Sequence, residues 1–250
     1  MPVFTPASGR VLKTETRLFT REPGTLFWVL VFPPLLLTAF GLIPGYRKPD
    51  ADLGGLRAID VYVPSTVLVA LITASLQAMP AALTGYRERG ILRRMRTTPA
   101  RPADLLVAQM VLHLAAALLA ALLVLALGNL VYDVALPQNP LAYAVTLALA
   151  AVASLAMGAV ITSVARTAKA ATAIGMSVFF PAMFAAGIYV PVQVLPDAVR
   201  QIVELTPFGA TAQALSEAAT GNWPAWDHLA ALGLWGVVLM ATAARWFRWE

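Results

Sequence analysis

Long apolar runs separated by short polar segments dominate the pattern of this chain. Six of them are long enough to cross a bilayer as helices, which takes about 20 apolar residues each. Their expected ranges are 25–44, 61–83, 104–128, 141–164, 170–190 and 229–247. The run LHLAAALLAALLVLALGNL does not alternate apolar and polar residues, so a membrane β-barrel is excluded. The pattern therefore predicts an all-α polytopic membrane protein with six transmembrane helices.

Residues 9–22, ahead of the first apolar run, show a weaker amphipathic pattern. Their apolar positions recur at a seven-residue interval with charged residues between them. These positions are Val11, Leu12, Leu18 and Phe19. Pro23 is expected to end the helix. The segment predicts an N-terminal helix lying along the inner membrane surface. The alternative is a solvated leader with basic anchors.

Residues 190–228 are too polar, and too often interrupted by proline, to cross a bilayer. Two short apolar faces lie within this segment. The first contains Leu195, Val199, Ile202 and Val203, and the second contains Phe208, Ala212 and Leu215. We expect two short amphipathic or re-entrant helices on the outer side, where protein can bury their backbone.

The composition also indicates a membrane protein. The chain is 59% hydrophobic and 12% charged, whereas soluble domains are about 45–50% apolar and about 25% charged. We expect residues 1–250 to form one transmembrane domain with no separate soluble catalytic domain. The net charge of +5 does not indicate nucleic-acid binding, because the basic residues flank apolar runs. The absence of cysteine excludes disulfides and thiolate chemistry.

The distribution of lysine and arginine predicts the orientation in the membrane. With the N-terminus inside and six spans, 14 of the 18 basic residues lie on the cytoplasmic side. The four outside are Arg47, Lys48, Arg57 and Arg200. This asymmetry favours both termini in the cytoplasm.

The chain lacks the common catalytic motifs. H-E-x-x-H, G-x-S-x-G and clusters of acids at metal spacing are all absent from the sequence. G-x-x-x-x-G-K-[ST] is absent too, so the chain cannot bind ATP through a P-loop. We therefore expect no enzyme, metal or cofactor site in this chain. If ATP drives the protein, ATP and magnesium bind to a separate ATPase.

The interiors of the six runs hold no Asp, Glu, Lys or Arg. Proton-driven transporters often use intramembrane carboxylates as relays, so proton coupling here would fall on His113 alone. The alternative for His113 is a hydrogen-bonded packing role, and His228 is expected at the membrane interface. The candidate substrate path consists of the mild polar residues Thr73, Gln77 and Ser177. Hydrogen bonding between helices is the alternative for these residues.

The most basic stretch, residues 85–102, carries six arginines and one acid between two membrane-length runs. Lipid cannot accommodate this charge, so a cytoplasmic loop is expected. On a helix with about 100° per residue, three apolar side chains share one arc with Glu88 in its middle. They are Ile91, Leu92 and Met95. An unpaired acid on an apolar stripe suits docking to a partner, and a purely topogenic loop is the alternative.

Three short motifs follow one another along the chain. They are R-L-x-x-R-E-P at 17–23, Y-R-E-R-G-x-L-R-R-x-R-x-T-P at 86–99, and F-x-x-G-x-Y-x-P-x-x-x-L-P at 184–196 followed by L-T-P-F at 205–208. The second resembles the E-R-E-x-G-T-L-x-x-L-x-x-[ST]-P stretch of type-2 ABC-transporter permeases. The first is similar to their connector helix, and the third to their outer signature. The chain thus resembles the membrane subunits of bacterial ABC exporters of the daunorubicin-resistance type.

This resemblance implies a dimer of permeases bound to two ATPase subunits. It implies a connector helix at 9–22, a coupling segment at 85–98 and an outer gate within 190–228. The implied coupling residues are Tyr86, Arg87, Glu88, Arg89, Gly90, Ile91, Leu92 and Met95. The implied connector residues are Arg17, Arg21 and Glu22, and the implied gate residues are Tyr189, Pro191, Pro196, Pro207 and Phe208. Ile91 departs from the family, which often has threonine there.

We therefore expect the permease subunit of an ATP-driven ABC exporter in the bacterial inner membrane. A second permease copy, identical or not, and two ABC ATPase subunits are the expected partners. The cargo is expected to be an apolar or amphipathic drug, lipid or glycan-lipid, because the span interiors carry no fixed charge. A proton-coupled secondary exporter that uses His113, and a scaffold that transports nothing, are the alternatives.

Overall fold

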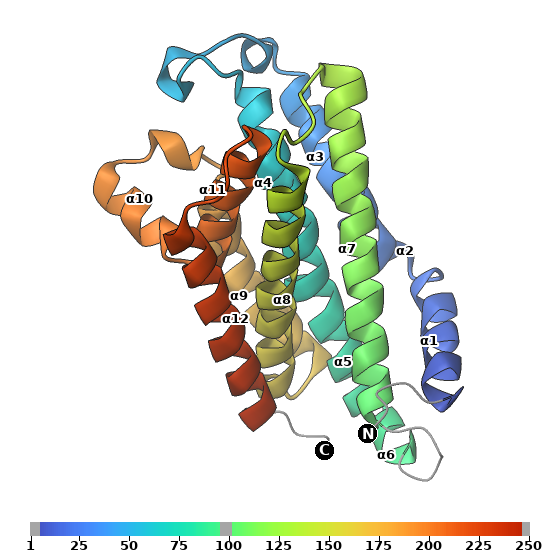
Figure 1. The fold of residues 1–250 in the computed structure, drawn as a ribbon. Helices are drawn as coiled ribbons and strands as arrows, with labels where there is room; N and C mark the ends of the chain where they lie inside the picture. The colour runs from blue at the N-terminus through green and yellow to red at the C-terminus, as the bar shows by residue number, and fades with distance from the viewer. Residues whose placement is uncertain (1–5, 96–101, 247–250) are drawn as a thin grey trace.

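The computed structural model describes residues 6–95 and 102–246 and is helical over most of them. Six helical segments are long and apolar enough to cross a membrane, which confirms the predicted all-α polytopic fold. They form one bundle in which consecutive segments run in alternating directions (Figure 1). These six spans are Pro23–Gly41, Ala58–Glu88, Asp104–Tyr132, Pro140–Val164, Ala168–Ala185 and Trp226–Trp246.

Three of the predicted limits are wrong by four or more residues, including the end of the third span, which continues to Tyr132 rather than 128. The second span continues to Glu88 rather than ending at residue 83, so the start of the predicted loop belongs to the span. The fifth span ends at Ala185 rather than residue 190, because Gly187 has a φ of 77° that a helix cannot continue through. The predicted limit of the sixth span, residue 247, lies outside the described residues.

The first two spans each contain a wide π-helical turn between two α-helical parts. The first span consists of α2 (Pro23–Leu26), the π turn η1 (Phe27–Val31) and α3 (Phe32–Gly41). The second consists of α4 (Ala58–Ile72), the π turn η4 (Thr73–Ala78) and α5 (Met79–Glu88). The remaining spans are formed by α7 (Pro102–Tyr132), α8 (Pro140–Val164), α9 (Ala168–Ala185) and α12 (Trp226–Trp246).

Proline explains where both π turns occur. Pro80 has no N–H, so it cannot bond the Leu76 carbonyl as an α-helix requires, nor the Ser75 carbonyl as a π-helix requires. In the first span, Pro33 and Pro34 follow η1 in the same way. In both spans, proline therefore lies just after the π turn. It cannot donate the N–H that a carbonyl of that turn would otherwise accept.

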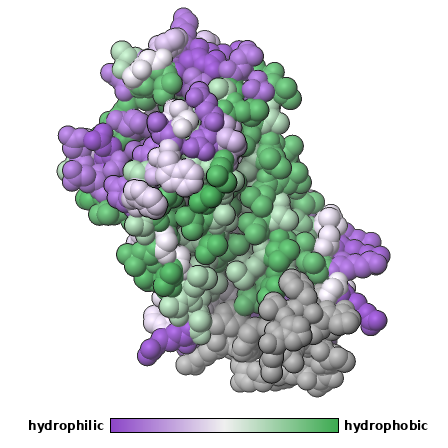
Figure 2. Space-filling model, in the orientation of Figure 1, coloured by the Kyte–Doolittle hydropathy of each residue, from purple (hydrophilic) through white to green (hydrophobic). Residues whose placement is uncertain are grey.

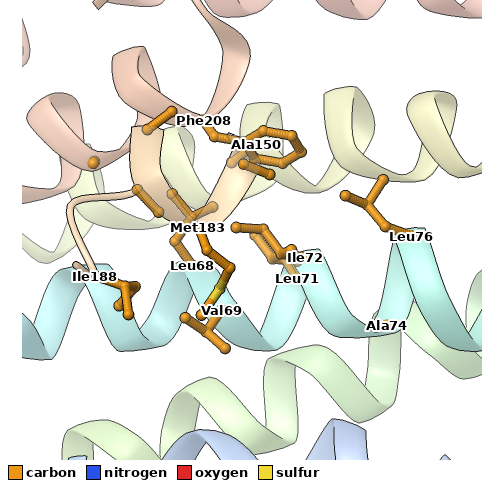
Figure 3. Packing of buried hydrophobic residues seen from close by; sticks show 14 of the residues in the cluster. Leu68, Val69, Leu71, Ile72, Ala74, Leu76, Ala150, Met183, Ile188 and Phe208 are labelled. Atoms are coloured by element: carbon orange, nitrogen blue, oxygen red, sulfur yellow. The ribbon is translucent and has the colours of Figure 1, made fainter. Parts of the chain in front are cut away.

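The second span forms the centre of the bundle. In its most apolar stretch 78% of the residues are buried, against 22% in the first and sixth spans. Leu68, Ile72 and Leu76 project from it toward side chains of α8, α9 and α11 (Pro207–Ala219), including Ala150, Met183 and Phe208 (Figure 3). This packing makes the second span the structural axis against which the other spans are positioned.

The outer surface of the bundle is apolar around its middle. Figure 2 shows hydrophobic side chains gathered there and hydrophilic ones toward the two ends. Leu122, Leu130 and Leu234 are each more than 60% exposed on this surface. An exposed apolar surface of this extent is typical of a surface that faces lipid.

One end of the bundle is basic. Here α5, α8 and α12 end and α7 and α9 begin, and we call it the basic end (Figure 1). Its basic side chains in the described residues include Arg87, Arg89, Arg166, Lys169 and Arg245. Helix α1 (Pro6–Phe19) packs lengthwise against the first half of α7 at this end, and the short α6 (Ile91–Met95) follows α5. The predicted connector helix is present, although it ends at Phe19 instead of continuing to residue 22. Its predicted position flat along the membrane surface is wrong, because α1 runs alongside α7, with Glu15 beside Gln109 and Phe19 beside His113.

The opposite end carries the two short helices predicted for residues 190–228. They are α10 (Asp197–Glu204) and α11 (Pro207–Ala219). The predicted apolar face of α11 is buried, but on α10 only Val203 is buried, and Val199 and Ile202 are exposed. The difference arises because Gly209 lets the start of α11 pack directly on the Val203 carbonyl, whereas the rest of α10 stands away from the bundle.

Candidate coupling site and groove

The predicted coupling segment is broken in the middle. Helix α5 ends at Glu88, Gly90 has a φ of 66°, and α6 starts at Ile91. A φ in the left-handed region ends a helix and is accessible to glycine at little cost. The predicted continuous helix that groups Glu88 with Ile91, Leu92 and Met95 is therefore wrong. Residues 96–98 of the predicted segment lie outside the described residues.

The break divides the segment into an exposed charged corner and a packed short helix. Glu88 and Arg89 are exposed at the corner, and Glu88 forms no ion pair within the described part of the chain. Leu92 on α6 is buried, and Ile91 is half-buried. The charged pair is thus more accessible to a partner than Ile91 and Leu92 of α6.

A buried carboxylate ties the connector helix to two spans. Glu15 on α1 is only 6% exposed. Its Oε2 accepts a hydrogen bond of 2.7 Å from the Tyr86 hydroxyl on α5 and one of 2.6 Å from Gln109 Nε2 on α7. Hydrogen bonds to an ionised group are about twice as strong as those between neutral groups. Glu15, Tyr86 and Gln109, which we call the connector junction, therefore join α1, α5 and α7 at one point.

Of these three residues only Tyr86 was predicted from the sequence, and Glu15 and Gln109 were not. A signal for Glu15 exists, because it lies four residues after Val11 and four before Phe19. One face of α1 thus carries a carboxylate within its apolar stripe. An acid in that position needs a polar partner on the surface that the helix covers.

His113 lies next to the connector junction. It is almost fully buried, its Nδ1 lies 2.8 Å from the Gln109 carbonyl oxygen, and its ring meets the Phe19 ring edge-on at 5.4 Å. Because a carbonyl oxygen can only accept, Nδ1 carries the hydrogen. The histidine therefore packs α1 against α7 and bonds to its own helix. Its Nε2 has no hydrogen-bond partner among the described residues.

The predicted connector residues lie on the outside of this assembly. Arg17, Arg21 and Glu22 are all exposed. The Glu22 carboxylate accepts a hydrogen bond of 3.2 Å from the Thr25 hydroxyl, at the start of the first span. These three side chains are accessible to a partner, whereas α1 is attached to the bundle through Glu15 and Phe19.

An apolar groove lies between the first span and the second and fifth spans. Its volume is about 470 Å³. It is lined by Trp28, Phe32, Leu36, Phe40, Thr73, Gln77, Met176, Phe179, Phe180, Met183, Ile188 and Tyr189. Two of the three predicted path residues, Thr73 and Gln77, are thus among its walls. Ser177 is exposed and does not line it, and its hydroxyl donates to the Ile174 carbonyl.

A second hollow of about 450 Å³ continues the groove toward the basic end. The two hollows share Trp28, Gln77 and Met176, and the second extends to Glu22, Tyr86 and Arg89. The Gln77 amide nitrogen has no hydrogen-bond partner among the described residues. The groove thus combines apolar walls with one unpaired donor near its middle, and it leads to the charged corner beside the connector junction.

Comparison with known protein families identifies the chain. The family model described as ABC-2 type transporter matches residues 9–219. The chain belongs to the ABC-2 type transporter family. It is therefore a membrane permease subunit of an ABC transporter, and its implied partner is an ABC ATPase, since ABC-2 permease domains carry no ATPase site of their own. Comparison with curated proteins gives no significant match.

The matched region of this ABC-2 permease runs from the connector helix α1 through α11. It includes the connector junction, the charged corner at Glu88 and all residues that line the groove. The sixth span, α12, follows the matched region. The geometry described above thus lies within the part of the chain that carries the family relationship.

The residues predicted for the outer gate of the ABC-2 permease lie around α10 and α11. Tyr189 is half-exposed and lines the groove. Pro191 and Pro196 precede the short turn Val192–Val194 and α10, and Pro207 and the buried Phe208 begin α11. The prolines thus fix where each short helix starts, which is the position proline favours.

Polar contacts also stabilise this end of the permease, opposite the basic end. Arg57 pairs with Asp60 at 2.6 Å and donates to the carbonyls of Tyr132 and Asp133, which joins the second span to the end of the third. The hydrogen bond to Asp60 raises the pKa of Arg57. His228 Nδ1 lies 3.3 Å from Glu217 Oε1, which joins the start of α12 to α11. Within the described residues no group of His, Asp and Glu is arranged to hold a metal ion.

Proposed function

We propose that this ABC-2 permease is the membrane subunit of an ATP-driven exporter in the inner membrane of a bacterium. The basic end would face the cytoplasm, because lysine and arginine accumulate in cytoplasmic loops. ATP and magnesium would bind to two copies of a separate ATPase. Two permease copies, identical or different, would complete the complex.

The connector junction is the observation that carries this proposal. Tyr86 lies two residues before the exposed Glu88, so a force applied at Glu88 or Arg89 acts on the last turn of α5. Through Glu15 the same turn is bonded to α1, and through Gln109 to α7. A movement that starts at the charged corner is thereby passed to the helix that leads into the first span.

The mechanism follows from this arrangement. Closure of the ATPases on ATP would displace Glu88 and Arg89, and the connector junction would make α1 move with the end of α5. Because α1 precedes the first span, the wall of the groove that carries Trp28 and Phe32 would shift relative to Thr73 and Gln77 on the second. Rigid-body switching of packed helices in this way is a common route between inward- and outward-open states.

The groove supports an apolar or amphipathic cargo, such as a drug, a lipid or a glycan-lipid. Its walls are aromatic and aliphatic, and the unpaired Gln77 amide offers one hydrogen bond to an acceptor on the cargo. The second permease copy would cover the open side of the groove. We expect Gln77→Leu to change cargo selectivity, and Ser177→Ala, outside the groove on the fifth span, to have no effect.

The proposal is tested by Glu88→Lys in the permease purified with its ATPase from native membranes. Reversal of the exposed charge should reduce the ATPase retained on the tagged permease and its ATP hydrolysis. Asp52→Lys is the matched control, since Asp52 is an exposed acid at the opposite end of the bundle. The amount of ATPase per permease and the rate of phosphate release are the measurements.

The alternatives give different results in the same experiment. Retention and hydrolysis that are unchanged in Glu88→Lys would contradict the coupling role. Export of a lipophilic dye from cells that survives Glu88→Lys, but is lost in His113→Ala and with an uncoupler, would establish a proton-coupled exporter instead. A permease that retains no ATPase and exports no dye would support a scaffold.

A further inference from the structure

A third hollow lies at the basic end, away from the groove. Its volume is about 770 Å³, and the ends of the second, fourth and sixth spans surround it. It is lined by Arg87, Glu88, Ser163, Val164, Ala165, Arg166, Arg245 and Trp246. Arg87 and Glu88 belong to the predicted coupling segment, but neither the sequence patterns nor the export mechanism assigns a role to the hollow itself.

The charges around the hollow favour an anion. Arg87, Arg166 and Arg245 come from three separate parts of the chain, and Glu88 is the single acid in the lining. Arg87 is held in place, because its Nη1 donates 3.0 Å to the Ala165 carbonyl just after α8. Arg166 and Arg245 are exposed and retain the freedom to reach a ligand. Guanidinium groups suit phosphate because their planar N–H donors match its oxygens.

Apolar side chains stand beside these arginines. Val164 is 48% exposed at the end of α8, and Trp246 is 55% exposed at the end of α12. Tryptophan at the end of a span is typical of the level of the lipid headgroups. A free phosphate ion gains nothing from these two side chains, whereas a phospholipid can place its phosphate among the arginines and its glycerol and upper acyl carbons against Val164 and Trp246.

We propose that this hollow binds the headgroup of an anionic phospholipid of the leaflet that surrounds the basic end. The lipid would bridge the ends of the second, fourth and sixth spans at the side of Glu88. Its presence would hold Arg166 and Arg245 together, which otherwise repel each other. The site is independent of ATP and of cargo, so it does not rest on the proposed export function.

The test uses the purified full-length permease in a neutral detergent without its ATPase. Its thermal stability is measured with increasing short-chain phosphatidylglycerol, short-chain phosphatidylcholine, or inorganic phosphate. We expect phosphatidylglycerol to stabilise the protein at concentrations at which the other two do not. The double variant Arg166→Gln/Arg245→Gln should weaken the apparent affinity by about fivefold for each arginine removed. Lys169→Gln, an exposed basic residue at the same end but outside the hollow, should match the unmodified protein.

Each other outcome overturns the proposal. Equal stabilisation by inorganic phosphate would show a free-anion site, and equal stabilisation by phosphatidylcholine would show apolar contact without headgroup recognition. An unchanged affinity in the double variant would place the lipid elsewhere. If that variant binds lipid normally but loses its ATPase in a pull-down, the hollow receives the ATPase and not a lipid. Normal elution of the variant on size exclusion confirms that it is folded.

Discussion

The π turns of the first and second spans have the same local cause and opposite surroundings. Both turns are followed by proline, which removes the helical partners of the preceding carbonyls. In η4, residues Thr73 through Leu76 are buried, whereas in η1 only Val29 is buried and Trp28 is 49% exposed. Both turns line the groove, but the turn in the second span is mostly buried by protein and the turn in the first span is mostly exposed.

Two glycines explain how η4 is enclosed. A methyl group at Gly158 of α8 would overlap the Ser75 carbonyl oxygen, and one at Gly175 of α9 would overlap the Leu76 carbonyl oxygen. Pro80 can supply neither of these carbonyls with a helical N–H. Close approach of small residues is a general means of packing membrane helices. In the part of the chain that the structure describes, no glycine of a neighbouring span packs on the carbonyls of η1 in this way. We therefore infer that η4 stays fixed in the bundle and that the first span, with η1, moves relative to it.

The largest effect is expected from Gly158→Val. The added side chain would push α8 away from the Ser75 carbonyl, and overpacking against backbone costs about 3 kcal/mol or more. For a chain of this size the unfolding temperature should fall by roughly 6–12 °C. The measurement is the fraction of permease that remains monodisperse after heating in detergent.

Gly233→Val in α12 is the matched control for this substitution. Nothing lies within 4 Å of a methyl group placed at Gly233, so the variant should retain nearly all of its thermal stability. An equal loss in both variants would show that valine in a membrane helix is itself harmful. That result would contradict the proposed difference between η4, on which glycines pack, and η1.

The pattern of the sequence predicts the elements better than their distortions. Six spans and the two short helices α10 and α11 follow from apolar runs and proline positions, because burial in lipid leaves helices as the default. The π turns could not be placed, since a proline such as Pro80 shows that a helix is disturbed but not how its neighbours accommodate it. The glycines that do so belong to other spans, and their contacts depend on how the spans pack.

The candidate site shows the same limit. The motif around Glu88 was visible in the sequence, yet the helical projection placed it on an apolar stripe that the turn at Gly90 removes. Glu15 has no motif around it, and its partners Tyr86 and Gln109 are 71 and 94 residues away. A local pattern can identify an exposed contact, but a buried junction between distant helices depends on tertiary packing.

The second largest effect is expected from Glu15→Ala. This variant tests how α1, which leads into the first span, is connected to the second and third spans. The substitution leaves the buried Gln109 amide and the Tyr86 hydroxyl without their acceptor. Hydrogen bonds to a charged group contribute about 1.5–3 kcal/mol. Hydrogen exchange of the α1 amides should therefore become at least about tenfold faster, while α4 is unaffected. Lys13→Ala, on the exposed side of α1, is the control, and unchanged exchange in Glu15→Ala would contradict the connector junction.

A smaller effect is expected from Gly175→Ala. Its methyl group would press against the Leu76 carbonyl, and a small shift of α9 can relieve part of the overlap, so a loss of about 1–2 kcal/mol is expected. Thermal unfolding of the variant is compared with Gly24→Ala in the first span, where a methyl group meets nothing within 4 Å. If Gly24→Ala were the more damaging of the two, the assignment of fixed and moving spans would be reversed.

The smallest effect on stability is expected from Trp28→Ala in η1. The side chain is half-exposed and lines the groove, so its removal should change the unfolding free energy of the isolated permease by no more than about 0.5 kcal/mol. Leu76→Ala in η4, by contrast, leaves a cavity in a fully buried site and should cost about 2–5 kcal/mol.

A second permease copy is proposed to cover the groove. Trp28→Ala should therefore shift the monomer–dimer equilibrium toward monomer in sedimentation, whereas Leu76→Ala should not do so before it unfolds. A large thermal loss in Trp28→Ala with an unchanged dimer would show that η1 is packed as firmly as η4, and the groove could then not open by movement of the first span.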